Sequence, residues 1–264
     1  MSPPEPPTGT ADPAVEPFSC AGFAGEVAVA YRPADLESAL LRLTDPASAT
    51  ETLHWGRNYL YAVSFETTAG DSHEVVVKQF RNKSPGQRMR RRLGVSKAWR
   101  SWQAALALER AGVPTPAPVL WIESYHSNEP SFYVSRRLEG CFEARYFLRA
   151  RNAGREAEQF PQIQAAALFD RLGRQLRRMH DAGIWHRDVS IGNLLVRPDR
   201  DGPTFFLIDL NRARLGRQLG VVRRSRDLCR LRILRREDRQ RLLRAYWGGA
   251  RVPLWGRAVY GAAF

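Results

Sequence analysis

The stretch Gly183-Ile-Trp-His-Arg-Asp-Val-Ser-Ile-Gly-Asn-Leu-Leu-Val196 carries the most informative pattern in the chain. Within it, Asp188 is followed five positions later by Asn193, and a short apolar run begins directly after Asn193. A polar segment and a second apolar run, 205–208, come next, and that run ends in Asp209. Two short apolar runs joined by polar residues predict a β-hairpin. The pattern therefore predicts that the carboxylates of Asp188 and Asp209 emerge at neighbouring strand ends.

This layout resembles the catalytic loop of protein kinases and the metal-binding aspartate that follows it. Phosphoryl transfer requires an acceptor held in line, a carboxylate to take its proton, and oxygen ligands for the magnesium on the nucleotide. On this interpretation Asp188 is the catalytic base, while Asn193 and Asp209 hold magnesium. A lone His-Arg-Asp could instead be a buried, salt-bridged turn, but the complete arrangement is far less expected by chance.

Length, composition and cysteine usage indicate a globular protein of a reducing compartment. The 264 residues suit one domain or two small lobes, and 44% of them are hydrophobic, enough for a sizeable core. No apolar run approaches the roughly 18 residues of a membrane span. Residues 1–17 are proline-rich and lack a secretory pattern, which predicts a disordered tail. Cys20, Cys141 and Cys229 form no CxxC pair, so we expect free cytoplasmic thiols rather than disulfides or a zinc site.

The formal charge of +14 calls for an anionic partner, yet only three of the 41 basic residues are lysine. Arginine keeps its charge and binds phosphate or carboxylate with two parallel donors. Nucleic acid, an anionic membrane surface and a phosphorylated substrate are all compatible with this charge. The charge alone does not choose among them.

The N-terminal half predicts one short strand at 26–31, a helix at 32–43, and then three strands at 52–55, 59–65 and 73–80. Strand, tight turn, strand, turn and strand is the order of a kinase N-lobe. Gly56-Arg57-Asn58 stands where a glycine-rich loop would cover the nucleotide phosphates. Because it holds a single glycine, a generic hairpin turn is equally consistent with it.

Lys78 closes the third strand, where a lysine is usually only a solvated strand end. In a chain so poor in lysine, we instead expect its ammonium to contact the α- and β-phosphates of a nucleotide. The helix predicted at 96–111 would be the one whose glutamate pairs with that lysine. The expected position carries Ser101, and Glu109 lies about two turns further on, so this pair is in doubt.

The C-terminal half predicts a hairpin at 119–124 and 131–138, a hinge at 136–140 lining an adenine pocket, and a core helix at 165–182. Only about twelve residues separate the segment after Asp209 from the next basic run, too few for a peptide-docking platform. Asp227 would either cap a helix or hold the catalytic loop, and we expect the second.

The predicted fold class is therefore α+β, a bilobal protein-kinase-like fold with an antiparallel-sheet N-lobe and a reduced, mainly helical C-lobe. The predicted boundaries are a tail at 1–17, the N-lobe at 18–136 and the C-lobe at 137–264. A short C-lobe favours a small molecule or a lipid headgroup over a protein as substrate.

Taken together, these motifs resemble the lipopolysaccharide core kinase family of Gram-negative bacteria over about 53–231. The resemblance is carried by Gly56-Arg57, Lys78, Ala111-Gly-Val-Pro-Thr-Pro116, His186-Arg-Asp-Val-Ser-Ile-Gly-Asn193, Ile208-Asp-Leu-Asn-Arg-Ala-Arg214 and Arg226-Asp-Leu228.

The resemblance implies an ATP- and Mg-dependent kinase that phosphorylates 3-deoxy-D-manno-octulosonic acid (Kdo) or heptose of the lipopolysaccharide inner core. Gly56, Arg57 and Lys78 would bind ATP, Asp188 would activate the acceptor hydroxyl, and Asn193 and Asp209 would bind magnesium. The acceptor would be Kdo-lipid A or core oligosaccharide. The protein would be cytoplasmic with peripheral contact at the inner membrane, and nucleic acid is not expected as a partner.

Two basic clusters are candidates for contact with anionic lipid at that membrane face. They are Arg88, Arg90, Arg91 and Arg92 above the cleft, and Arg212 and Arg214 beside the site. For the first cluster, a merely solvated loop is an equally good interpretation.

Three alternatives remain open from the sequence. An atypical, RIO-like protein kinase is disfavoured by the short segment after Asp209. An ATP-binding pseudokinase is disfavoured by the retained Lys78, Asp188 and Asn193, although Ser101 slightly favours it. A nucleic-acid-binding protein would explain the charge, but no zinc pattern or RNP-like aromatic run supports it.

Overall fold

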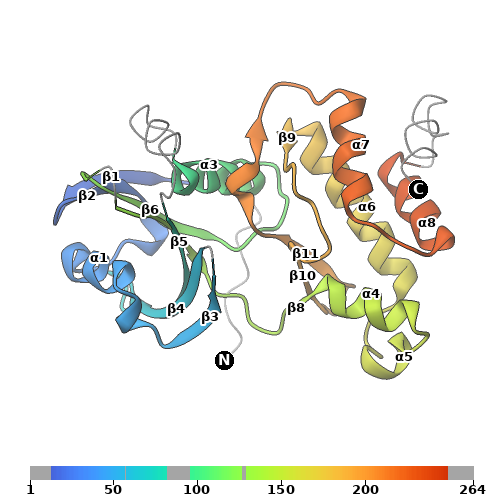
Figure 1. The fold of residues 1–264 in the computed structure, drawn as a ribbon, viewed down its shortest axis with the longest axis horizontal. Helices are drawn as coiled ribbons and strands as arrows, with labels where there is room; N and C mark the ends of the chain where they lie inside the picture. The colour runs from blue at the N-terminus through green and yellow to red at the C-terminus, as the bar shows by residue number, and fades with distance from the viewer. Residues whose placement is uncertain (1–12, 57, 82–95, 127–128, 249–264) are drawn as a thin grey trace.

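The computed structural model describes residues 13–56, 58–81, 96–126 and 129–248. It has two lobes, an N-terminal lobe built on a large antiparallel sheet and a mainly helical C-terminal lobe (Figure 1). The predicted α+β class with an antiparallel-sheet N-lobe is therefore confirmed.

The N-terminal sheet has seven strands in the order β1-β2-β6-β7-β5-β4-β3, and every neighbouring pair is antiparallel. The strands are β1 (Val15–Cys20), β2 (Phe23–Ala28), β3 (Glu51–Trp55), β4 (Tyr59–Glu66), β5 (Ser72–Phe80), β6 (Pro118–Ser124) and β7 (Ser131–Arg136).

The start of the sheet corrects the predicted disordered tail. Val15 to Pro17 belong to β1, which pairs with β2 along its whole length. Pro17 is tolerated there because β1 is an edge strand, where one side of the backbone needs no ladder hydrogen bond. The rest of that prediction, 1–12, lies outside the described residues.

Within the described ranges, one helix covers each face of the sheet. On the first face, α1 (Leu36–Thr44) buries Leu40 and Leu43 against strand residues such as Val75 and Val77. The short 3-10 helices η1 (Val29–Tyr31) and η2 (Pro46–Ser48) flank α1. The helix predicted from 32 begins only at Leu36, because the Asp35 side chain caps it by accepting a hydrogen bond from Ser38 N at 3.1 Å.

On the other face, α3 (Lys97–Arg110) packs between the sheet and the C-terminal lobe (Figure 1). Ser96 caps its N-terminus by accepting from Trp99 N at 2.9 Å, and Gly112, with φ +61°, ends it. The carboxylate of Glu26 on β2 accepts hydrogen bonds from Trp102 Nε1 at 2.6 Å and from Trp121 Nε1 at 3.1 Å. Glu26 thus ties α3 to strands β2 and β6.

The C-terminal lobe follows β7 and combines short strands with helices. Its elements are β8 (Phe142–Glu143), α4 (Ala144–Asn152), α5 (Glu156–Gln159), α6 (Ala165–Asp181), β9 (Ile184–Trp185), β10 (Leu194–Arg197), β11 (Thr204–Leu207), η3 (Leu210–Arg212), β12 (Arg214–Leu215), α7 (Val221–Arg230) and α8 (Arg236–Tyr246).

The core of this lobe is organised by α6. The predicted apolar stripe Leu168, Leu172, Leu176 and Met179 is buried, which confirms it as core. Gly183 ends the helix with φ +77°, and a Cβ there would come within 1.8 Å of Gly216 O. Only glycine allows this close approach, which brings β12 alongside β9.

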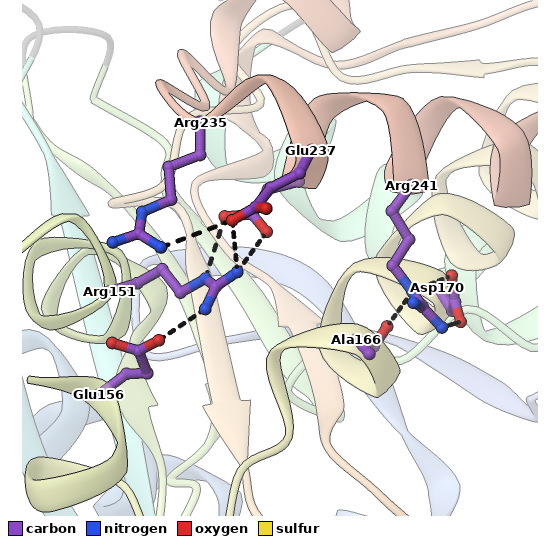
Figure 2. A network of polar contacts seen from close by, with 8 residues as sticks. Arg151, Glu156, Ala166, Asp170, Arg235, Glu237 and Arg241 are labelled. Carbon is purple, nitrogen blue, oxygen red and sulfur yellow. Dashed lines mark hydrogen bonds and ion pairs between the residues drawn. The ribbon is translucent and has the colours of Figure 1, made fainter. Parts of the chain in front are cut away.

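A polar network joins three helices at the outer end of the lobe (Figure 2). Arg151 of α4 donates to Asp238 of α8 at 3.1 and 3.0 Å, to Glu156 of α5 at 2.5 Å, and to Glu237 at 3.0 Å. The hydrogen bonds to buried Asp238, together with the one to Glu156, raise the pKa of Arg151. The network fixes α4 and α5 against α8.

None of the helices among these described residues is long and apolar enough to cross a membrane.

Candidate active site

The predicted hairpin is present and brings Asn193 and Asp209 to the same end of two paired strands. β10 and β11 are antiparallel, with Leu194 opposite Leu207. Asn193 directly precedes β10, and Ile208 N donates to Asn193 O at 3.0 Å. Asp209 follows immediately in the left-handed region, with φ 59° and ψ 53°, which turns the chain out of the strand.

Asn193 is joined to the loop that carries Asp188. Its side-chain Nδ2 donates to the backbone carbonyl of Asp188 at 2.8 Å. This leaves the Oδ1 oxygen of Asn193 available as an acceptor, and the backbone of Asn193 is bonded to Ile208, the residue before Asp209. One amide oxygen and one carboxylate are the hard oxygen donors that magnesium takes from proteins when it also binds nucleotide phosphates. The residues present therefore fit this ion.

Lys78 of the N-terminal lobe reaches this site across the space between the lobes. Its Nζ lies 2.6 Å from Asp209 Oδ1, and the two side chains are 17% and 33% exposed. Asn211 Nδ2 also donates to Asp209 Oδ1. The described contacts thus join Lys78 to Asp209, and join Asn193 both to the strand end before Asp209 and to the backbone of Asp188.

The position on α3 that was expected to pair with Lys78 holds a serine and not an acidic residue. Ser101 is buried and donates its hydroxyl hydrogen to Lys97 O at 2.9 Å within α3. Burial raises the pKa of Glu109 to about 7. Burial also raises the pKa of Tyr133, and the charge of nearby Glu109 adds to that increase. Among the described contacts, the ammonium of Lys78 is paired with Asp209 instead.

Asp227 of α7 holds the catalytic loop from beneath, as the second of the two sequence interpretations predicted. Its carboxylate is fully buried and accepts hydrogen bonds from His186 N at 3.1 Å and from Arg187 N at 3.0 Å. His180 Nε2 lies 3.3 Å from the same carboxylate. Arg187 has φ 69°, so this anchor fixes a strained backbone directly before Asp188.

His186 is a structural support in this loop. Its Nε2 lies 3.1 Å from Ile208 O, and its Nδ1 lies 3.3 Å from Asp188 N. These partners require a neutral ring that donates at Nε2 and accepts at Nδ1. Complete burial lowers the pKa of His186, which is consistent with the neutral form. The ring therefore links the loop of Asp188 to the strand that leads to Asp209.

Two arginines cover the carboxylate of Asp188. Arg230 Nη1 of α7 lies 3.1 Å from Asp188 Oδ1, and Arg212 Nη1 of η3 lies 3.4 Å from Asp188 Oδ2. Sequence reasoning placed Arg212 beside the site but did not single out Arg230. The signal was available, because Arg230 is one helical turn from Asp227 and so lies on the same face of α7.

The remaining predicted site residues are not joined to this group by the described contacts. Gly56 lies in the turn between β3 and β4, where a Cβ would come within 2.6 Å of His54 Nε2. Arg57 and the cluster Arg88, Arg90, Arg91 and Arg92 lie outside the described residues. The hinge, 136–140, connects β7 to β8, and its role in an adenine pocket remains a prediction.

A protein-family model, curated proteins and a solved structure all match this chain. A model of the lipopolysaccharide kinase (Kdo/WaaP) family matches 48–246. The lipopolysaccharide core heptose(I) kinase WaaP of Pseudomonas aeruginosa is 31% identical over 168 residues, which cover 59% of this chain and 61% of that protein. A 3-deoxy-D-manno-octulosonic acid kinase of Mannheimia succiniciproducens is 30% identical over 126 residues, which cover 47% of each chain.

A solved structure described as WaaP in complex with acyl carrier protein matches with a TM-score of 0.62 and 24% identity. The match covers 88% of this chain and 95% of that chain, and it confirms the kinase-like fold. The aligned region spans about half to three fifths of the length of the curated relatives. The family model, in contrast, covers most of this chain. The chain therefore belongs to the lipopolysaccharide kinase (Kdo/WaaP) family.

Proposed function

We propose that this protein is an ATP- and magnesium-dependent phosphotransferase that phosphorylates a sugar hydroxyl, on Kdo or heptose, of the lipopolysaccharide inner core. The observation that carries the proposal is the meeting of Lys78, Asp188, Asn193 and Asp209 at one end of the β10–β11 hairpin. Family membership supports the substrate class, since its relatives are named as heptose and Kdo kinases.

In the proposed reaction, Lys78 holds phosphate oxygens of ATP, and Asp188 lies where the acceptor hydroxyl would approach. Asp188 accepts the hydroxyl proton as the acceptor oxygen bonds to the γ-phosphorus. The bond from that phosphorus to its bridging oxygen breaks, and ADP leaves. Asn193 Oδ1 and Asp209 would hold the magnesium, which would neutralise charge on the phosphates. Asp227 and His186 keep the loop in the conformation that this geometry needs.

The finer parts of the proposal concern the acceptor and its location. Kdo-lipid A or core oligosaccharide would be presented at the cytoplasmic face of the inner membrane, with the protein bound there peripherally. Exposed Arg212 and Arg214 support this placement, because basic side chains are attracted to anionic lipid surfaces.

The test is ATP consumption with magnesium and Kdo-lipid A, comparing wild type with Asp188→Asn. Removing the base should lower kcat by at least about a hundredfold, because general-base catalysis contributes on this order. The matched control is Asp199→Asn in the β10–β11 turn, which should retain wild-type turnover. Asp199 pairs with Arg197 at 2.8 Å at the opposite end of the hairpin.

Equal turnover by wild type and Asp188→Asn would contradict the assigned base. Magnesium-nucleotide binding without turnover on any core acceptor would instead favour a pseudokinase. Transfer of label to the protein itself would favour an atypical protein kinase.

A further inference from the structure

Four arginines from four different segments lie close to one another, and two of them contact Asp188; we call the four the arginine cluster. They are Arg187 of the catalytic loop, Arg212 of η3, Arg214 of β12 and Arg230 of α7. Arg212 and Arg230 contact the Asp188 carboxylate, yet their side chains remain 52% and 49% exposed. Burial lowers the pKa of Arg187, and the nearby charges of Arg214, Arg212 and Arg230 lower it further.

In the part of the chain that the structure describes, the cluster carries more positive charge than the neighbouring carboxylates balance. Asp188 is the carboxylate that Arg212 and Arg230 contact. Buried Asp227 is already engaged by the backbone N–H groups of the loop, and Asp209 is engaged by Lys78. Like charges held close together lower stability unless an anion joins them, and guanidinium groups suit phosphate and carboxylate oxygens in particular.

The contacts to Asp188 also crowd the approach of an acceptor hydroxyl. Each carboxylate oxygen has its own guanidinium partner, at 3.1 and 3.4 Å. A base must come within about 2.6–3.2 Å of the hydroxyl that it deprotonates. A carboxylate has about four acceptor positions, so the two guanidinium groups compete with the hydroxyl for the remaining positions and for space. A second anion on the acceptor would draw the guanidinium groups to itself and open this approach.

We propose that the arginine cluster binds a phosphate or carboxylate already present on the acceptor, next to the hydroxyl to be phosphorylated. Arg212 and Arg230 move from Asp188 to this anion, and the carboxylate becomes available as the base. The site thereby selects acceptors that are anionic before the reaction and disfavours neutral sugars. This inference rests on the proposed function, since it assigns the acceptor side of the same site.

The variant for the test is Arg212→Gln combined with Arg230→Gln. Its charge-matched control combines Arg174→Gln on the exposed face of α6 with Arg200→Gln in the β10–β11 turn. With Kdo-lipid A, the KM for the acceptor should rise at least about tenfold in the first variant, while the KM for ATP stays near the wild-type value. The control variant should match wild type in both constants.

A second measurement does not depend on turnover. Calorimetric titration of inorganic phosphate into protein saturated with magnesium and a non-hydrolysable ATP analogue should show binding to wild type and to the control. Binding should be at least about tenfold weaker in the cluster variant. If no core acceptor is turned over, the proposed function fails but this titration still decides the anion site.

Two results would overturn the inference. One is a cluster variant that keeps wild-type phosphate affinity and acceptor KM while only kcat falls, which would make the arginines positioning residues for Asp188. The other is loss of binding to phosphatidylglycerol vesicles with unchanged phosphate affinity, which would assign the cluster to the membrane surface.

Discussion

Arg187 and Asp209 both adopt positive φ values, 69° and 59°, on either side of the proposed reaction centre. Aspartate tolerates the left-handed region because its short side chain can bond locally, but for arginine it costs on the order of 1–3 kcal/mol. The hydrogen bond from Arg187 N to Asp227 offsets this cost. A single buried carboxylate therefore determines the direction in which Asp188 leaves the loop.

At the same scale, Glu109 should make stability depend on pH. Burial raises its pKa from 4.5 to about 7, so the folded protein binds this proton more tightly than the unfolded chain. Between those two pH values the folded state holds more protons, and stability falls as pH rises through the window. Glu109→Gln removes the ionisation, so it should raise the free energy of unfolding at pH 8 by at least about 1 kcal/mol.

Urea unfolding at pH 4 and pH 8 would measure this effect. At pH 4 the gain should vanish, because wild-type Glu109 is protonated in the folded state there. Glu158→Gln on the exposed side of α5 is the control and should have little effect at either pH. A gain of the same size at both pH values would show that ionisation of Glu109 is not the cause.

At the scale of elements, the polar network of Figure 2 offers a direct comparison of two arginines. The Arg151 side chain is 17% exposed and forms an ion pair with buried Asp238. The Arg241 side chain is 50% exposed and forms an ion pair with Asp170 at 2.7 Å on the surface. Arg151→Ala leaves a buried charge unpaired and should cost about 3 kcal/mol in free energy of unfolding. Arg241→Ala should cost less than about 1 kcal/mol, because water already screens its pair.

The measurement is urea-induced unfolding of both variants at neutral pH, followed by circular dichroism. Equal losses from the two substitutions would mean that Asp238 finds another partner or water when Arg151 is removed.

Elements with their own start and stop signals were predictable from the sequence. Ser96 marks the start of α3 and Gly112 marks its end. The apolar stripe of α6 identifies the face that is buried. The predicted start of α1 was wrong because a proline suits the first turn of a helix, but here Asp35, two residues after Pro33, supplies the cap. β1 was missed because its short, proline-containing run becomes a strand only through pairing with β2.

At the scale of the whole molecule, Lys78 and Asp209 join the two lobes at the proposed nucleotide site. A magnesium-bound ATP analogue at about a hundred times its Kd should stabilise wild type by roughly 2–3 kcal/mol. Lys78→Met should lose most of this stabilisation, because the ammonium that would contact the phosphates is gone. Thermal unfolding with and without the analogue measures it, and chelating the magnesium provides the control. Undiminished stabilisation of Lys78→Met would rule out this role.

The sequence predicted the grouping of Lys78, Asp188, Asn193 and Asp209 because each lies at a recognisable end of a strand or loop. The spacing of Arg230 and Asp227 could have placed Arg230 on the face of α7 toward the loop, but its hydrogen bond to the Asp188 carboxylate depends on how α7 packs there. The sequence could not predict Glu26 as the partner of two tryptophans, since the three residues are brought together only by the sheet and α3.

The contacts of Glu26 make the β1–β2 hairpin part of the support of α3. Glu26 lies before the region 48–246 that matches the family model, yet its carboxylate binds Trp102 of α3 and Trp121 of β6. A chain trimmed to the matched region would therefore lose the acceptor that ties this helix to the sheet, and the indole N–H of buried Trp102 would be left without it.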